Sequence, residues 1–288
     1  MRSIGEILNR QPKPFDINDF GGLREDEYIK DDFIWCKKCH TKRLWRSPDG
    51  TVAVRCICHC EQEAINEEER QEKEQARLRK IEKLKKASLI GVRYKDVTFE
   101  TTETGHNDTF DNAYNRCKKY CDVADNVLAD GLGIYLYGDK GTGKTHLTAC
   151  MANALMQDGK QVLFTNFAEI AKMIKGTFGN ARESEADYIN RIANIDFLFI
   201  DDLGTERVQA ANGGDLWLQE KIFDVLNKRY NNRKPTIFTS NYTLQELITE
   251  RGIMDKTVDR IVEMSHAVIK VEGKSYRMKA RAKVELPF

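Results

Sequence analysis

Long hydrophobic runs are missing from this sequence of 288 residues, and no apolar stretch approaches the roughly 18 residues that a membrane span requires. The first six residues, MRSIGE, also lack the apolar core of a secretory signal peptide. From these two absences we expect no membrane association and a cytoplasmic location.

Net charge is nearly absent as well, because 46 basic residues face 45 acidic ones and leave a formal charge of +1. This balance excludes a histone-like polycation or an acidic tail, so any contact with nucleic acid must be local. The charged fraction of 32% is above the globular average, which fits a soluble protein with charged, exposed helix. The length allows one large domain or two smaller ones, with a sizeable core.

The eight cysteines are unevenly placed, and five of them crowd into residues 36–60. In a cytosolic chain this crowding indicates metal ligation before disulfides. A C-x-x-C pair, Cys36 and Cys39, precedes the segment CICHC by a 16-residue gap, a usual zinc-ribbon spacing for tetrahedral Zn²⁺. The metal would supply much of the folding free energy of so short a module. A four-coordinate site needs two more ligands besides Cys36 and Cys39, and the sequence offers more candidates than that: Cys56, Cys58, Cys60 and, less favoured, His40 or His59.

The three other cysteines are scattered, and we expect them in the core or on helix faces: Cys117, Cys121 and Cys150.

Residues 61–87 contain eight acidic and eight basic residues and neither glycine nor proline. The acids come mostly first and the bases last, which suits the helix macrodipole, and Glu69 with Lys73 has the i,i+4 spacing of a stabilising pair. We expect a solvated connecting helix. The alternative, nucleic-acid binding by the dense basic residues of its second half, is weakened by the balancing acids.

From about residue 90 onward, short apolar segments alternate with helical ones. Strands are expected at 133–137, 161–164, 196–200, 236–239 and 267–271, and helices at 146–157, 167–177, 216–231, 244–249 and 257–264. This alternation predicts an α/β fold with a parallel sheet and crossover helices.

The segment GDKGTGKT at residues 138–145 matches the phosphate-binding loop pattern and lies between an apolar strand and a helix. Its backbone N–H groups and the helix start would bind phosphate oxygens. Lys144 would neutralise the β- and γ-phosphates of ATP, and Thr145 would offer its hydroxyl to Mg²⁺. The remaining residues expected to contact the nucleotide are Gly138, Asp139, Lys140, Gly141, Thr142, Gly143 and His146.

Two adjacent carboxylates, Asp201 and Asp202, end the apolar segment FLFI. Two adjacent negative charges are destabilising unless the carboxylates bind a cation or position a water molecule. We assign Asp201 to Mg²⁺, mainly through water, and Asp202 to polarising the attacking water. Asn241 follows the next strand, where it could bond the γ-phosphate or serve as a turn residue.

Together these residues resemble the AAA+ ATPases, and within them the DnaC/DnaI-type replicative helicase loaders and the related IstB transposition helpers. The resemblance covers about residues 91–279 and includes GVRYKDVTF at 91–99, TSN at 239–241, VDR at 258–260 and SYR at 275–277. It implies that Asn241 is the sensor I residue and Arg260 the arginine finger, with Arg251 as the fallback and Arg277 as a second phosphate-sensing arginine.

The resemblance also implies a division of labour. Residues 1–60 would be a zinc-binding, helicase-interacting domain, with Cys36, Cys39, Cys58 and Cys60 as ligands and Cys56 as the substitute. Residues 61–90 would be the charged helical linker. Residues 91–288 would be the AAA+ domain, which binds single-stranded DNA and assembles with copies of itself.

The sequence departs from many AAA+ enzymes at Asp202, where a glutamate is common. Aspartate is one methylene shorter, so its carboxylate would lie about 1 Å or more farther from the water. We therefore expect slow hydrolysis, which suits a switch better than a motor.

Three functions are compatible with these residues to different degrees. The first is an ATP-dependent loader of the replicative helicase onto single-stranded DNA, in a bacterial or phage replicon, which the zinc module favours. The alternative is a transposition helper that binds DNA and recruits a transposase. A binding module with a degenerate nucleotide site is disfavoured, because the phosphate-site residues are all present. Lys172, Lys175 and Phe178 could contact DNA, or belong to an ordinary amphipathic helix.

Overall fold

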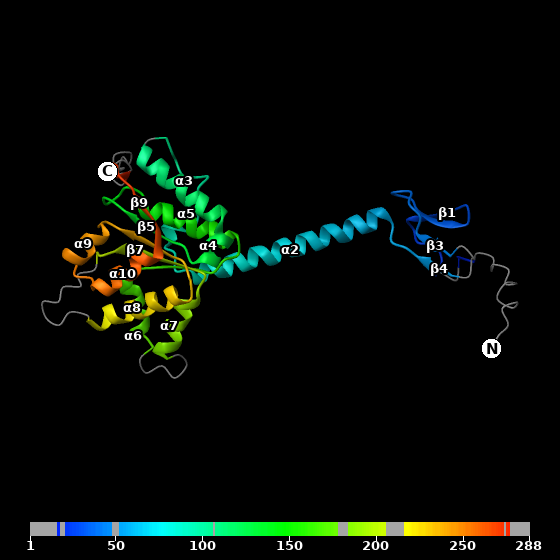
Figure 1. Cartoon of the computed structure of the whole chain (residues 1–288). Helices are drawn as coiled ribbons and strands as arrows, with labels where there is room; N and C mark the ends of the chain where they lie inside the picture. The colour runs from blue at the N-terminus through cyan, green and yellow to red at the C-terminus, as the bar shows by residue number, and fades with distance from the viewer. Residues whose placement is uncertain are drawn as a thin grey trace, which may run out of the picture. The chain divides into compact units, whose positions relative to one another are not determined.

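The computed structural model describes residues 16–17, 21–47, 52–105, 107–177, 184–205, 216–273 and 275–276. The chain divides into two compact units, Met1–Leu78 and Arg79–Phe288. The division falls within helix α2 (His59–Ala87), the long helix labelled in Figure 1.

The first unit is built from two antiparallel hairpins and has a very small core. Its strands are β1 (Glu27–Lys30), β2 (Phe33–Cys36), β3 (Leu44–Arg46) and β4 (Ala53–Arg55). A bridge between Trp35 and Lys42 connects the hairpins. Its buried hydrophobic residues among those described are Ile34, Cys36, Leu44 and Cys58. So few apolar side chains give little burial energy, as expected for a module that a metal stabilises.

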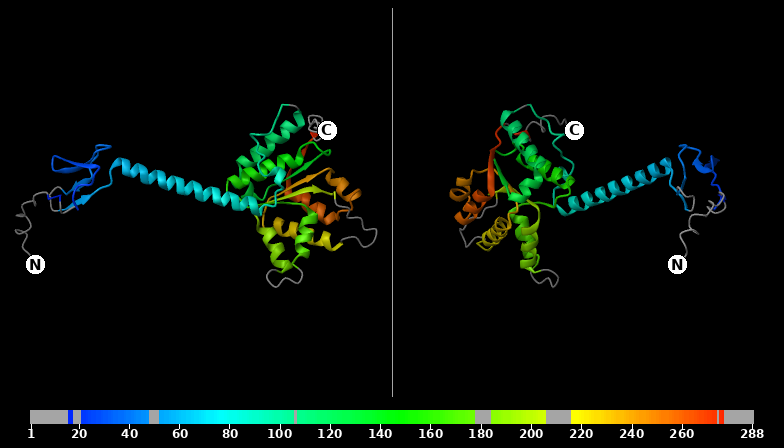
Figure 2. Two further views of the ribbon diagram at one scale, coloured as in Figure 1. Left: turned by 180° about the vertical axis from the view of Figure 1, so that it is seen from behind. Right: turned by 45° about the vertical axis from the view of Figure 1, so that its right-hand side comes forward.

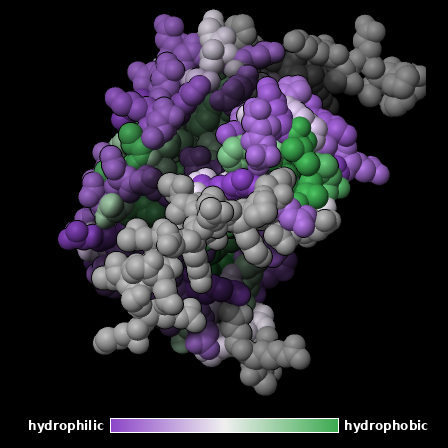
Figure 3. Space-filling view, turned by 90° about the vertical axis from the view of Figure 1, so that its right-hand side faces the viewer, coloured by the Kyte–Doolittle hydropathy of each residue, from purple (hydrophilic) through white to green (hydrophobic). Residues whose placement is uncertain are grey.

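Helix α2 begins two residues earlier than the sequence predicts and ends at the predicted residue, Ala87. It has no buried residue, and its ion pairs include Lys73 with Glu69 at 3.3 Å and Lys86 with Glu82 at 2.8 Å. The prediction of a solvated helix is confirmed. Among the described helices, none has the length and apolar character to cross a bilayer. Hydrophilic residues cover most of the described surface seen in Figure 3.

The second unit contains a five-stranded parallel sheet with the order β6-β7-β8-β5-β9. All five strands match predicted segments to within a few residues: β5 (Gly133–Tyr137), β6 (Val162–Thr165), β7 (Phe197–Leu203), β8 (Thr236–Ser240) and β9 (Ser265–Lys270). The three central strands, β7, β8 and β5, are buried along most of their length because helices cover both faces. The predicted α/β architecture is confirmed.

Alternate side chains of β5, β6, β7 and β8 enter two separate cores. In β5, Ile134 and Leu136 pack with α3 (Asp108–Asp122), α4 (Ala124–Asp130) and α5 (Lys144–Gln157). Tyr135 packs on the other face of the sheet, which the remaining helices cover (Figures 1 and 2). These are α6 (Phe167–Lys175), α7 (Glu185–Asn194), α8 (Leu216–Asn231), α9 (Leu244–Thr249) and α10 (Asp255–Met264). Cys117, Cys121 and Cys150 are buried, as expected.

Helices α3, α4 and α7 were not predicted. The signal for α7 is a capping box, in which Ser184 and Asp187 satisfy each other's backbone N–H groups. The signal for α3 is Asn107, whose side chain accepts hydrogen bonds from the N–H groups of Thr109 and Phe110.

One fully buried arginine joins helix α7 to the starts of strands β7 and β8. Arg229 of α8 donates to the carbonyl oxygens of Ile192 at 2.8 Å, Ile195 at 2.8 Å and Pro235 at 2.6 Å. These carbonyls lie near the end of α7 and at the starts of β7 and β8. The guanidinium group thus supplies donors to carbonyl oxygens at the end of α7, and a second donor to that of Pro235, which also accepts the N–H of Leu198 at 3.4 Å.

Candidate functional site

The phosphate-binding loop connects the end of β5 to the start of α5, as predicted. Gly138 has φ +142° and Gly143 has φ +100°, values that favour glycine. A Cβ at Gly138 would lie 2.1 Å from the carbonyl oxygen of Val271, and one at Gly143 would lie 2.7 Å from the ring of Phe110. The two glycines therefore allow a tight loop that a larger residue would open.

Lys144 joins this loop to the neighbouring strand end. Its side chain is buried, and Nζ donates to the carbonyl oxygens of Gly138 at 2.7 Å and Asp139 at 2.8 Å, and to Oδ1 of Asn241 at 3.1 Å. Lys144 and Asn241 are 97 positions apart in sequence. They meet because β5 and β8 are adjacent parallel strands whose carboxyl ends share one edge.

Asp201 lies at the same edge and is held by two hydroxyl groups. Thr145 Oγ1 donates to its carboxylate oxygens at 3.0 and 3.2 Å, and Thr239 Oγ1 donates to Oδ1 at 2.6 Å. Burial raises the pKa of Asp201, and the hydrogen bond from Thr239 partly offsets this. A hydroxyl and a carboxylate in contact, beside a phosphate loop, form a donor set that fits Mg²⁺.

A register shift in the β7–β8 pairing, between Ile200 and Leu203, places Asp201 and Asp202 in a bulge. Asp202 has φ +56°, a conformation that aspartate tolerates better than most residues. Its N–H donates to Thr239 Oγ1 at 2.9 Å instead of to a strand carbonyl. The bulge leaves Asp202 lining the cleft described next.

A cleft of about 930 Å³ opens over this edge of the sheet. Its lining includes Lys144, Thr145, Asp202 and Asn241, and also groups that sequence reasoning did not assign: Arg93, Tyr94, Thr102, Phe110 and Tyr276. The sequence identifies residues 91–99 only as a family motif and gives no signal that they line the cleft.

His146 also lines the cleft, and its Nε2 lies 2.9 Å from Thr102 Oγ1. Burial lowers the pKa of His146, and the charge of Arg93 lowers it further, so the neutral imidazole is favoured.

The predicted arginines lie in three different settings. Arg260 of α10 forms an ion pair with Glu263, stacks over Tyr230 at 4.3 Å and does not line the cleft. Arg251 stacks over Tyr242 at 4.9 Å and donates to the carbonyl of Thr205 at 3.4 Å, so it contacts the loop after Asp202. Arg277 lies outside the described residues.

The predicted DNA-contacting lysines both lie on α6. Lys172 Nζ is 3.8 Å from Glu169, and Lys175 Nζ is 5.0 Å from the ring centroid of Trp217. Phe178 lies outside the described residues.

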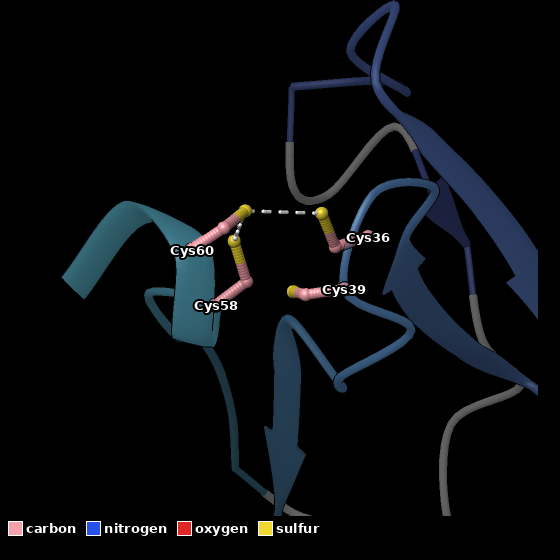
Figure 4. A group of neighbouring side chains, drawn as sticks. All are labelled: Cys36, Cys39, Cys58 and Cys60. Carbon is pink, nitrogen blue, oxygen red and sulfur yellow. Dashed lines mark hydrogen bonds between the residues drawn. The ribbon is translucent and has the colours of Figure 1, made fainter. Parts of the chain in front are cut away.

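Four cysteine sulfurs converge in the first unit, where the start of α2 meets the turn after β2 (Figure 4). The Sγ atoms of Cys36, Cys39, Cys58 and Cys60 all lie within 4.8 Å of one another. A tetrahedron with Zn–S bonds of about 2.3 Å has edges of about 3.8 Å. The separation of 3.6 Å for Cys36–Cys60 is close to that value, and that of 3.3 Å for Cys58–Cys60 is shorter. Cys56, the alternate candidate, does not belong to this group.

Neighbouring groups favour the thiolates of Cys39 and Cys58, whereas the hydrogen bond with Cys58 raises the pKa of Cys60 to about 12. The hydrogen bond with Thr41 lowers the pKa of Cys39 to about 5. Burial opposes ionisation of Cys58, but the guanidinium of Arg43, 3.0 Å from its sulfur, lowers the pKa of Cys58 overall. Four soft sulfur donors fit Zn²⁺ far better than Mg²⁺ or Ca²⁺.

The model of the family described as IstB-like ATP binding protein matches residues 59–284. The chain is 28% identical to the replicative helicase loader DnaC of Escherichia coli K12 over 174 residues, which cover 60% of this chain and 66% of the loader. It is 31% identical to the phage-like element PBSX protein XkdC of Bacillus subtilis over 209 residues, covering 70% of this chain and 75% of XkdC.

The crystal structure of a DnaC helicase loader has a TM-score of 0.51 and 22% identity, covering 63% of this chain and all of that one. This likeness shows that the second unit has the AAA+ P-loop fold. Sequence similarity makes the chain homologous to the DnaC/DnaI-type loaders, and its family supports ATP binding. The match over 226 of 288 residues decides the family: the chain is a member of the IstB-like ATP-binding proteins.

Proposed function

We propose that this protein is an ATP-dependent loader of the replicative DNA helicase onto single-stranded DNA, in a bacterial or phage replicon. The observation that carries the proposal is the meeting of Lys144, Thr145, Asp201 and Asn241 at one sheet edge in a chain homologous to helicase loaders. The four-cysteine module before the ATPase unit supports the loader over other ATPases of this fold.

In this proposal Lys144 binds the β- and γ-phosphates, and Asn241, which it already contacts, orients the γ-phosphate or its water. Thr145 and Asp201 hold Mg²⁺, which neutralises charge on the phosphates. Asp202 polarises the attacking water from the bulge. Its short side chain makes hydrolysis slow, as suits a switch.

Arg260 would reach the nucleotide of a neighbouring subunit, because it lies outside the cleft of its own chain. Hydrolysis would then depend on self-association. Arg277 stays a candidate for a second phosphate-sensing arginine.

Residues 1–60 would hold the hexameric helicase, with Zn²⁺ on Cys36, Cys39, Cys58 and Cys60. Residues 61–90 would link this domain to the ATPase domain, 91–288, which binds single-stranded DNA. We place the protein in the cytoplasm, where replication occurs.

The test is a pull-down of the replicative helicase by the full chain in the presence of ATP, with a variant lacking residues 1–60 as the comparison. We expect retention by the full chain and its loss on truncation, while ATP binding persists. Absence of retention by the full chain, alongside ATP-dependent DNA binding, would overturn the loader assignment.

The second candidate is a transposition helper that binds DNA and recruits a transposase. The match to the IstB-like family model favours it, because that model covers the whole charged helix and nearly all of the ATPase unit. Retention of a transposase in place of helicase in the same pull-down would support this candidate.

A further inference from the structure

One face of the β1–β2 hairpin carries aromatic and basic side chains. In the register of this hairpin, Tyr28 is opposite Trp35 and Lys30 is opposite Phe33. The alternate strand positions point the other way, and of these Glu27, Ile34 and Cys36 are buried while Ile29 is exposed. Since strand side chains alternate, Tyr28, Lys30, Phe33 and Trp35 share the outer face.

Two cations from the next segment extend this face over the rings. Lys42, which forms a β-bridge with Trp35, places Nζ 3.9 Å from the ring centroid of Phe33 and 5.4 Å from that of Trp35. Arg46 lies 5.7 Å from the Phe33 centroid. Such contacts are worth only about 0.5–1 kcal/mol when exposed, so the ammonium group of Lys42 can turn toward a stronger anionic partner.

The acidic residues of the hairpin lie away from this face or at its end. Glu27 is buried and pairs with Arg43 and Arg55, and Asp26 pairs with Arg43 at 2.8 Å. Asp31 and Asp32 occupy the turn between the strands. The described strand positions of the face therefore combine three aromatic rings with positive charge and contain no carboxylate.

We propose that this aromatic–cation face (Tyr28, Lys30, Phe33, Trp35, Lys42 and Arg46) binds single-stranded nucleic acid. Unpaired bases stack on the rings, and the cations contact the phosphates. Single strands fit better than a duplex because base pairing hides the base faces that the rings need. The inference goes beyond the loader function, which assigns DNA to the ATPase unit.

The site is small. A four-residue strand spans about 13 Å, so the face contacts only a few nucleotides and binds weakly alone. Joined by α2 to a second DNA-binding unit, it would add to binding through effective concentration.

The first experiment cross-links the full chain, without nucleotide, to an oligothymidylate carrying 5-iodouracil, and maps the linked peptides by mass spectrometry. We expect cross-links in the peptide containing Phe33 and Trp35. In the double variant Lys30→Glu, Lys42→Glu, whose two sites are exposed, we expect at least a tenfold loss of that cross-link. The salt dependence of binding should also become shallower by a log–log slope of about 1.4, from two lost phosphate contacts.

The matched control is Trp45→Ala. Trp45 is exposed and adjoins Arg46 on β3, so it points away from the Phe33 side, and its loss should leave the cross-link unchanged. Zinc content and circular dichroism verify folding of each variant.

The second experiment leaves every residue of the aromatic–cation face unchanged. A Trp45→Phe, Trp217→Phe variant keeps Trp35 as its single tryptophan. We expect oligothymidylate to quench its fluorescence. The proposal is overturned if Trp35 emission stays unchanged while anisotropy shows bound DNA, or if all cross-links map to residues 79–288. Quenching by purified helicase but not by DNA would assign the face to a protein partner and also overturn it.

Discussion

The hydroxyl group of Thr239 donates a hydrogen bond to Oδ1 of Asp201 at 2.6 Å, and its oxygen, Oγ1, accepts one from the N–H of Asp202 at 2.9 Å. One side chain of β8 thus positions both the carboxylate of Asp201, which is assigned to Mg²⁺, and the backbone of Asp202, which is assigned to the attacking water. A hydrogen bond to a charged group contributes about 1.5–3 kcal/mol.

We therefore expect Thr239→Val to lower kcat for ATP about tenfold or more and to raise the Mg²⁺ concentration needed for half-maximal rate. Thr239→Ser keeps the hydroxyl and should retain most activity. Steady-state hydrolysis over a Mg²⁺ titration measures both effects. Equal losses in the two variants would argue against the hydroxyl.

Asp202→Asn preserves size and tolerance of the left-handed backbone while removing the charge. Because Asp202 is assigned to the water and not to the phosphates, hydrolysis in the presence of DNA should fall at least tenfold and ATP affinity should change by less than about threefold. Single-turnover hydrolysis and a fluorescent-nucleotide titration separate the two. Unchanged turnover in Asp202→Ala would falsify the assignment.

Lys144→Ala should weaken ATP binding at least tenfold, because Nζ is the positive charge nearest the predicted phosphate position. The control is Lys119→Ala, which removes a positive charge from the exposed surface of α3. This variant should bind ATP with the affinity of the parent protein. Isothermal titration calorimetry with ATP and Mg²⁺ makes the comparison. Equal affinities in the two variants would count against a phosphate role for Lys144.

Arg43 is a buried residue that donates to the sulfur of Cys58 and pairs with Asp26 and Glu27. Groups that hydrogen-bond metal ligands commonly contribute 10- to 100-fold in metal affinity. Arg43→Met should therefore release Zn²⁺ to a chromogenic chelator at about tenfold lower chelator concentration. Arg24→Met, at an exposed arginine of the same unit, is the control and should behave like the parent.

Removing Arg229 would leave several buried carbonyl oxygens without donors, each at a cost of about 1–3 kcal/mol. Arg229→Leu should lower the free energy of unfolding by at least about 3 kcal/mol in urea denaturation. Lys228→Leu, at the adjacent position, loses a surface hydrogen bond to Asn190 and should lower it by less than about 1 kcal/mol. Similar midpoints for both would contradict a structural role for Arg229.

Much of the second unit could be predicted because its signals are local. The apolar strands, the glycine spacing before Lys144 and the paired carboxylates each lie within a few residues. Parallel pairing then brings the ends of β5, β7 and β8 together. The bulge at Asp202 could not be predicted, because it depends on a hydroxyl from a strand 37 positions away.

In the cysteine cluster, too, the local sequence predicts only part of the site. Spacing predicts a metal site, but three cysteines lie within five positions of the second half and spacing does not choose among them. The choice depends on where α2 begins, since Cys58 and Cys60 flank its first residue, His59, while Cys56 lies before it. Helix α3 was missed because its polar residues outnumber its buried ones.

Arg229 also bears on how the second unit assembles. Its partners lie up to 37 positions before it and 7 positions after it, so the full set of these bonds requires α7, β7, α8 and β8 together. Their formation is coupled through one side chain. These four elements should therefore open together in native-state hydrogen exchange, as a single cooperative folding unit.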